Sequence, residues 1–178
     1  FMETLVIPNI ENVYRRERAR DELPQSGSGR TIMTAEPKVV PEEAAQIQLE
    51  GGAAFSVRLI DCVGYMIDGA AGHMEEDAER MVKTPWSEEE IPFTQAAEIG
   101  TDKVMRDHST IGLVITTDGS IGELPRSNYL GAEEKTILAL KKSGKPFLVL
   151  VNSQKPYSEE TRQVAEEIGK KYDVAVMP

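Results

Sequence analysis

Short apolar segments alternate along the chain with longer segments that are apolar on one side only. Residues 111–115 and 147–151 are apolar throughout, as are central strands of a parallel sheet, which are buried on both faces. Residues 55–60 alternate between apolar and polar before they become apolar, residues 174–177 are β-rich, and residues 44–50 fit an edge strand. The pattern therefore predicts a set of short strands.

Three segments between or after these strands have helical spacing: residues 93–108, 130–142 and 158–172. The last is expected to be capped by Ser158, and Gly144 is a plausible stop for the second. The residues expected on the buried sides are Ala96, Ala97, Gly100 and Val104 in the first helix, Leu130, Ile137 and Leu138 in the second, and Thr161, Val164, Ala165, Ile168 and Tyr172 in the third. Strands that alternate with helices predict an α/β fold with a parallel sheet.

Composition restricts the class of protein. The 178 residues suit one domain, and 40% hydrophobic residues exclude a disordered chain. A net charge of −10 argues against a general nucleic-acid coat, whose affinity depends on basic residues, but not against a nucleotide ligand. Cys62 is the single cysteine, so no intrachain disulfide can form, and no apolar stretch is long enough to suggest a membrane span.

A carboxylate follows one predicted strand at Asp61, and a glycine stands three residues later at Gly64. Such a carboxylate can hold Mg²⁺ through water, and a glycine amide can approach a terminal phosphate because no Cβ stands in the way. The same short pattern also fits an aspartate that caps the turn after a strand. Both interpretations stay open on the pattern alone.

Two more polar segments have the order found in nucleotide switches. Thr34 precedes the Asp61 strand and can offer its hydroxyl to Mg²⁺ and its carbonyl to an attacking water; a plain loop threonine is the alternative. Asn152, Ser153 and Lys155 follow the strand at 147–151, where guanine-nucleotide switches carry Asn-Lys-x-Asp, although a polar turn is the simpler interpretation. Lys155 stands at the position of the aspartate and cannot accept the hydrogen bonds of guanine, so we expect no strong selection for guanine.

The glycine-rich phosphate loop G-x-x-x-x-G-K-[ST] is absent, because none of the 14 glycines is followed by Lys-Ser or Lys-Thr. Both ends of the chain are expected to cut through structure. An uncapped apolar segment, Leu5–Ile7, lies at the start, and the predicted strand Val174–Met177 lies at the end. In a P-loop fold that loop joins the first strand to the first helix, and we expect both to precede residue 1. The chain by itself is therefore expected to bind ATP weakly or not at all.

Long strings, rather than short motifs, carry a resemblance to one family. They are Val6–Asn12, Asp21–Ser26, Arg30–Thr34, Asp61–Tyr65, Thr84–Trp86, Ile91–Phe93, Ala96–Thr101, His108–Gly112, Thr116–Gly122 and Gly144–Phe147. Together they resemble the stage IV sporulation protein A family, spore-coat morphogenetic proteins of endospore-forming bacteria. The resemblance implies a P-loop NTPase-like domain of the translation-factor GTPase type, with a mostly parallel sheet and helices on both faces. Its first strand and phosphate loop would be absent from these residues.

The resemblance also implies roles for individual residues. Asp61 matches the Walker B aspartate of switch II, and Thr34 matches the sensor threonine of switch I, beside Ala35 where the family often has a second threonine. Asn152, Ser153 and Lys155 match a degenerate base-recognition motif. The implied organisation is a single incomplete ATPase domain over residues 1–178, with a switch I-like region at 8–38 and a switch II-like region at 61–92.

The implied activity is Mg²⁺-dependent ATP hydrolysis coupled to self-assembly of a coat basement layer. The implied cofactors are ATP and Mg²⁺. The implied partners are further copies of the chain and, through regions mostly outside it, spore-coat proteins and a forespore membrane peptide; nucleic acid is not among them. The implied location is the mother-cell cytoplasm at the forespore surface. The alternative is a structural scaffold that binds nucleotide weakly or not at all.

An acidic segment follows Asp61. Residues 75–98 hold eight carboxylates against Arg80 and Lys83, whereas residues 15–20 hold four arginines. A solvated loop and helix face is the simpler interpretation. The alternative is that the acidic segment meets the arginine cluster of a neighbouring molecule.

Overall fold

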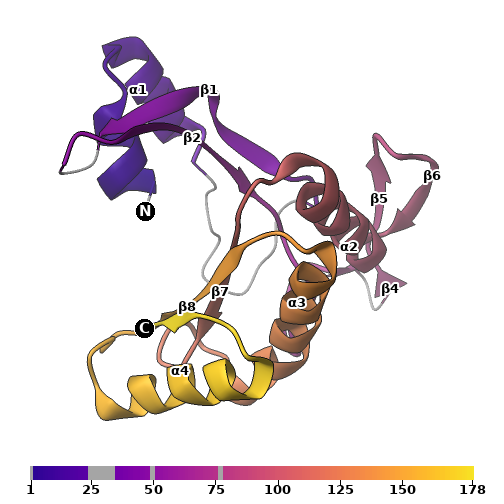
Figure 1. The fold of residues 1–178 in the computed structure, drawn as a ribbon. Coiled ribbons are helices and arrows are strands. Elements are labelled where there is room, and N and C mark those ends of the chain that lie inside the picture. The colour runs from indigo at the N-terminus through magenta and orange to yellow at the C-terminus, as the bar shows by residue number, and fades with distance from the viewer. Residues whose placement is uncertain (1, 24–34, 49–50, 76–77) are drawn as a thin grey trace. The chain divides into compact units, whose positions relative to one another are not determined.

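The fold was analysed in a computed structural model, which describes residues 2–23, 35–48, 51–75 and 78–178 (Figure 1). The described residues form two compact units. One lies within residues 1–25 and 37–61, and the other within residues 26–36 and 62–178. Each unit is described by itself below, and the prediction of a single incomplete domain stays a prediction.

Four α-helices and nine strands make up the regular structure of the described residues. The α-helices are α1 (Val13–Asp21), α2 (Phe93–Lys103), α3 (Leu130–Ser143) and α4 (Glu159–Tyr172). The strands are β1 (Lys38–Gln48), β2 (Ala54–Asp61), β3 (Met74–Glu75), β4 (Ala78–Glu79), β5 (Met81–Thr84), β6 (Ser87–Pro92), β7 (Gly112–Thr117), β8 (Phe147–Asn152) and β9 (Val176–Met177). Short 3₁₀ or π-helical segments lie at Met2–Val6, Ile7–Asn9, Val104–His108 and Arg126–Tyr129.

The first unit is an antiparallel hairpin of β1 and β2 with α1 beside it. The connection from Gln48 to Ala54 is too short for a crossover helix, so the two strands must run in opposite directions. Val6, Ile7 and Ile47 are fully buried in its core. The prediction of a strand at 55–60 is confirmed, whereas the strand expected at 44–50 begins earlier, at Lys38.

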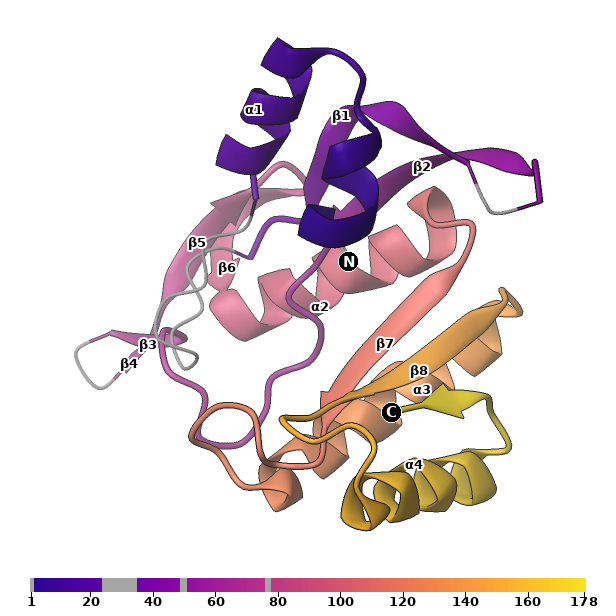
Figure 2. The same cartoon turned by 90° about the vertical axis from the view of Figure 1, so that its left-hand side faces the viewer.

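The second unit contains a parallel sheet with the strand order β7-β8-β9 (Figure 2). Residues Gly112 to Thr117 pair in register with Phe147 to Asn152, so β7 and β8 end at the same edge. Parallel pairing requires crossover connections, and α3 and α4 supply them. The predicted parallel α/β arrangement is confirmed for these three strands only, because the other described strands form antiparallel pairs.

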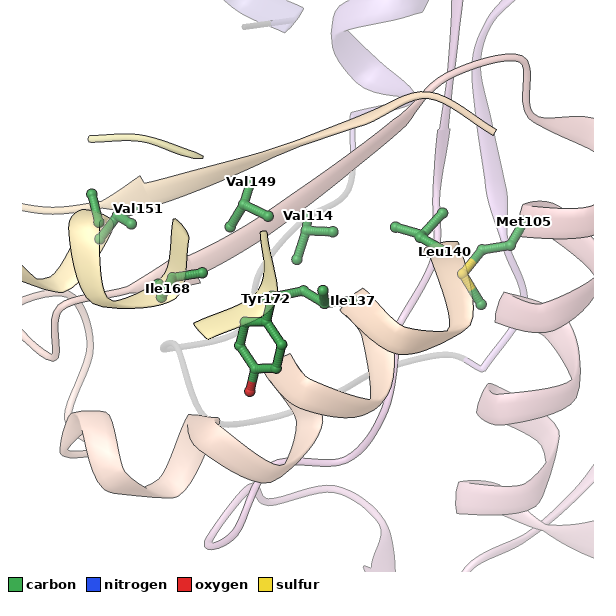
Figure 3. Packing of buried hydrophobic residues seen from close by; sticks show 9 residues of the cluster. Met105, Val114, Ile137, Leu140, Val149, Val151, Ile168 and Tyr172 are labelled. Carbon is green, nitrogen blue, oxygen red and sulfur yellow. The ribbon is translucent and has the colours of Figure 1, made fainter. Parts of the chain in front are cut away.

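The core of the parallel sheet lies between its strands and the helices α3 and α4 (Figure 3). Val114 and Val149 meet Ile137 of α3 and Ile168 of α4 there. The buried sides predicted for residues 93–108 and 158–172 are confirmed, apart from Val164, which is partly buried. The prediction for 130–142 is wrong in part.

In α3 the residues Leu130 and Leu138 are 45% and 51% exposed, and Leu140 is buried instead. The helix is apolar on more than one side, so spacing alone did not identify the side that packs. The opposite face of β7 is also open, since Leu113 and Ile115 are 43% and 68% exposed. Helices on both faces of this sheet are therefore not found in the part of the chain that the structure describes.

Residues 81–92 form a hairpin of β5 and β6, which the sequence pattern did not predict. Glu88, Glu89 and Glu90 lie exposed on β6. Directly after it, α2 begins at Phe93, which packs with Ala96 and Ala97 in a small core of its own. No helix among the described residues is long and apolar enough to cross a membrane.

Candidate functional site

A hydrogen-bond network surrounds Asp118, the residue directly after β7. Its Oδ1 accepts hydrogen bonds from the backbone N–H of Ser120 at 2.8 Å and from the Ser120 hydroxyl at 2.6 Å. Its Oδ2 accepts a hydrogen bond at 2.8 Å from the hydroxyl of Thr161, which is fully buried in the first turn of α4. One carboxylate thus joins the loop after β7 to the helix that follows β8.

Two opposing effects act on the pKa of Asp118. Burial by itself would raise that pKa, because it disfavours the charged form. The hydrogen bonds from Ser120, Ser153 and Thr161 favour the charged form and together outweigh burial, so the pKa lies well below its usual range. The carboxylate is therefore ionised at neutral pH and can only accept hydrogen bonds.

The loop after β8 is bonded to the same network. The backbone N–H of Gln154 donates to the Ser120 hydroxyl oxygen at 2.9 Å, and that of Lys155 donates to the Ser153 hydroxyl oxygen at 2.9 Å. The Ser153 and Thr161 hydroxyl oxygens are 3.0 Å apart. The backbone of the predicted base-recognition loop is therefore held by hydroxyl groups that converge on a single carboxylate.

An ion pair between the half-buried Arg126 and the buried Glu133 anchors the other end of the loop after β7. The Arg126 guanidinium donates to both carboxylate oxygens of Glu133 and, at 2.8 Å, to the carbonyl of Thr117. The Thr116 hydroxyl donates to the same Glu133 carboxylate at 2.6 Å. Gly119 has a φ of +91°, and a Cβ there would lie 2.9 Å from the backbone nitrogen of Arg126, so only glycine fits this close approach.

The segment after β2 is tied to α2. The backbone N–H of Gly64 donates to the buried hydroxyl of Thr101 at 3.0 Å. The Tyr65 hydroxyl donates to the Asp102 carboxylate at 2.9 Å. Burial, followed by the hydrogen bond to Asp102 and the charges of Asp102 and Glu98, raises the pKa of Tyr65 to about 12. The amide predicted to meet a phosphate is thus occupied by a side chain of its own unit.

Asp61 is the last residue of β2 and pairs in register with Lys38 at the start of β1. Although its side chain is in contact with solvent, burial raises the pKa of the Asp61 carboxyl, and the charge of Lys38 opposes that effect. The carboxylate therefore stands at a strand end, as predicted. Thr34 lies outside the described residues.

Comparison with known proteins adds a second kind of evidence. The family model for the ATPase domain of stage IV sporulation protein A matches residues 1–178. The chain belongs to this family. It is 54% identical over 177 residues to stage IV sporulation protein A of Bacillus anthracis and 53% identical to that of Bacillus subtilis (strain 168), each match covering 99% of this chain. The protein of Clostridioides difficile (strain 630) is 52% identical over the whole chain.

These relatives are much longer than the chain, which spans 36% of the length of each. No solved structure matches it. Membership of the stage IV sporulation protein A ATPase-domain family implies a P-loop NTPase-like fold, and the parallel sheet of β7, β8 and β9 is consistent with that fold. The resemblance stated from the sequence is confirmed.

The structure brings some of the predicted site residues together and leaves others apart. Ser153 and Lys155 are joined by a hydrogen bond in the loop after β8, and Asn152 ends that strand beside Thr117. Asp61 belongs to the first unit, whereas Gly64 and the 152–155 loop belong to the second. The two groups are therefore described separately, and their roles in this stage IV sporulation protein A domain stay predictions.

Asp118 is a functional candidate that the sequence analysis did not identify. Its bond to the Ser120 amide is typical of a turn aspartate, but the link to Thr161 and the Arg126–Glu133 pair are visible only in the structure. One available signal was the polar run Thr116–Ser120 directly after an apolar strand. The partner helix contributes Thr161 from 43 positions away, and no local pattern predicts such a pairing.

The family is an ATPase-domain family, and Asp61 is the described carboxylate that can be compared with the chemistry of Mg²⁺. Among the described residues no group of three or more histidine, cysteine, aspartate or glutamate side chains is placed to hold a metal ion. Mg²⁺ does not need such a cage, since it is usually bound by one or two protein oxygens together with water and substrate phosphates. Asp61, a single carboxylate at a strand end and in contact with solvent, suits that mode of binding.

Proposed function

We propose that this chain is the ATP-hydrolysing part of a longer protein and that hydrolysis is coupled to self-assembly of a spore-coat layer. The observation that carries the proposal is the match of an ATPase-domain family model to all 178 residues. The proposal extends to a location in the mother-cell cytoplasm, at the forespore surface. Coat proteins and a membrane peptide would be bound through regions mostly outside this chain.

The residues would act by positioning rather than by covalent chemistry. Bound Mg²⁺ supplies charge that stabilises the transferred phosphoryl group. Asp61 would hold the ion through water, and Thr34 would bind it directly and orient the attacking water. The Gly64 amide would meet the terminal phosphate, for which it must give up its hydrogen bond to Thr101. The phosphate-loop motif does not occur in the chain, and the other phosphate contacts would be made by a further segment of the longer protein.

The base-recognition loop supports ATP over GTP. Lys155 lies exposed in the loop after β8, and an ammonium group offers only donors. Recognition of guanine needs an acceptor for the N–H groups on its edge, and Lys155 stands where that acceptor would be. Asn152 and Ser153 would contribute the remaining side-chain contacts to the nucleotide.

A structural scaffold without a hydrolytic step is the second candidate. It is favoured by the extent to which the polar groups near the site are already paired, as with the Gly64 amide and Thr101. Self-assembly through opposite charges would need exposed acidic side chains, and Glu88, Glu89 and Glu90 are exposed. In the arginine cluster, Arg15 and Arg18 are instead paired within their own unit, with Glu43 in one case and Glu22 and Glu42 in the other.

The experiment uses the full-length protein that contains this chain. ATP turnover and sedimentation of assemblies are measured with Mg²⁺ and ATP, with ATP and a chelator, and with Mg²⁺ and a non-hydrolysable ATP analogue. We expect turnover and sedimentation only in the first condition, and a loss of turnover of about a hundredfold in Thr34→Ala. Equal sedimentation in all three conditions, with no turnover, would establish the scaffold instead.

A further inference from the structure

We propose that Asp118 is a positioning residue for nucleotide binding: it holds the 152–155 loop in place through Ser120 and Thr161. This inference rests on the proposed function, because it assumes that the loop contacts the base. It concerns a residue that the predicted site did not include. Asp118 contacts the loop through Ser153 and its support through Ser120 and Thr161, and it is not a catalytic residue.

The hydrogen bonds around Asp118 all run toward its carboxylate. The Gln154 N–H donates to the Ser120 hydroxyl oxygen, and the Ser120 O–H donates in turn to Asp118 Oδ1. Thr161 has one hydroxyl hydrogen, and its shortest bond, at 2.8 Å, is to Asp118 Oδ2. A carboxylate is required at the centre because both of its oxygens must accept.

The backbone amides that the serine hydroxyls hold lie within the 152–155 loop. The amides of Gln154 and Lys155 belong to the loop itself, and each is held by a serine hydroxyl at 2.9 Å. In open α/β sheets, ligands bind at the carboxyl ends of the strands, which is where β7 and β8 end together. Greater mobility of this loop would therefore weaken the binding of a ligand at that edge more than it would disturb the packing of the core.

The elements that hold Asp118 are themselves well anchored. Thr161 is fully buried at the start of α4, where Ser158 caps the helix by accepting from the Thr161 N–H at 3.2 Å. On the other side, Gly119 lies so close to Arg126 that a Cβ would stand 2.9 Å from its backbone nitrogen. The Arg126 side chain is in turn paired with Glu133. Asp118 thus connects two fixed elements to one loop.

The test uses the full-length protein that contains this chain, with Asp118→Asn as the main variant. An asparagine side chain keeps the size but places an N–H₂ donor where an acceptor is needed. Asp173→Asn, an exposed aspartate at the end of α4, is the matched control. Ser120→Ala is the second variant, because it removes the link from Asp118 to the Gln154 amide at an exposed position where folding is not at risk.

Two measurements are made on each variant. Hydrogen exchange followed by mass spectrometry reports on a peptide covering 152–157, with a peptide from 162–172 as the internal reference. Steady-state kinetics report the KM for ATP and kcat separately. We expect Asp118→Asn to speed exchange in 152–157 only and to raise KM about tenfold with kcat within about twofold, the size expected for one charged hydrogen bond. Ser120→Ala should show the same pattern to a smaller extent, and Asp173→Asn neither change.

The outcomes separate this inference from the proposed function. Unchanged exchange in 152–157 in both Asp118→Asn and Ser120→Ala overturns the positioning role, whatever the kinetics show. Faster exchange with an unchanged KM also overturns it, since the loop would then not bear on nucleotide. An absence of ATP turnover in the wild-type protein contradicts the proposed function itself, and a nucleotide role for Asp118 falls with it.

Discussion

The guanidinium of Arg126 and the carboxylate of Glu133 form two hydrogen bonds, of 2.9 and 3.0 Å, across the interface between the loop after β7 and α3. The Glu133 side chain is only 3% exposed. Glu133 also accepts a hydrogen bond from the Thr116 hydroxyl, and Arg126 donates to the Thr117 carbonyl, so the pair is bonded to the end of β7. This relationship fixes the path of the chain directly after β7, where Asp118 lies.

Removal of the Arg126 side chain should therefore lower the free energy of unfolding. Arg126→Met leaves the Glu133 carboxylate buried without its partner, and we expect unfolding to become easier by about 3–5 kcal/mol in urea denaturation. The double variant Arg126→Met/Glu133→Met should lose less than the single variant, because no uncompensated charge remains. Lys171→Met, which breaks the solvent-exposed pair with Glu134, is the control and should have a much smaller effect. Equal losses in the two single variants would contradict this account.

The buried hydroxyl of Thr101 accepts the hydrogen bond of the Gly64 amide, so its removal should lower the stability of the fold. Thr101→Val keeps the shape but leaves the amide without an acceptor, which should destabilise the fold by about 1–3 kcal/mol in urea denaturation. Thr101→Ser retains the hydroxyl and serves as the matched control, with a smaller loss expected. If valine proves no worse than serine, the hydrogen bond has no role in stability.

Low pH should remove the contribution of the Asp118 carboxylate to the stability of the fold. Its pKa is lowered in the folded state, so its carboxylate adds stability that is fully present above the ordinary aspartate pKa, about 3.9, and is lost as the pH falls towards the folded-state value. The stability difference between wild type and Asp118→Asn should be constant from pH 7 to about 5 and shrink below about 4. Urea midpoints across this range provide the measurement. A difference that grows on acidification would have the wrong sign for a lowered pKa.

Much of the second unit could be predicted from the sequence because its strands and helices have strong local signals. The run 147–151 is apolar throughout, and Ser158 followed by acidic residues marks the start of α4, so both elements were predicted within one or two residues. Gly144 ends α3 with a φ of +72°, as a glycine stop should. In each case one short segment contains all the information that the prediction needs.

The predictions failed where the structure depends on distant partners. Nothing in residues 81–92 indicates which segment they pair with, so the β5–β6 hairpin was missed. Leu138 fits the apolar side of α3, yet the sheet packs against Ile137 and Leu140. The bond from Thr161 to Asp118 likewise depends on a helix and a loop that meet only after folding. Patterns of spacing describe a local surface, and they do not specify what covers it.

If the loop after β8 reads the base as proposed, one substitution should change base selection. Lys155→Asp restores an acceptor where guanine-nucleotide switches have one, so the affinity for GTP relative to ATP should rise by about tenfold or more. Competition between the two nucleotides for the full-length protein measures the ratio. Lys142→Asp, which makes the same charge change at an exposed position of α3, should leave the ratio unchanged. An unaltered ratio in Lys155→Asp would mean that this loop does not read the base.

The central claim is that the stage IV sporulation protein A ATPase domain hydrolyses ATP with Asp61 as its metal-holding carboxylate. Its most direct test is kcat at saturating Mg²⁺ and ATP for the full-length protein and two aspartate variants. The account predicts that Asp61→Asn lowers kcat by about a hundredfold, while Asp68→Asn, at an exposed position seven residues later, retains wild-type turnover. Wild-type turnover in Asp61→Asn would contradict it.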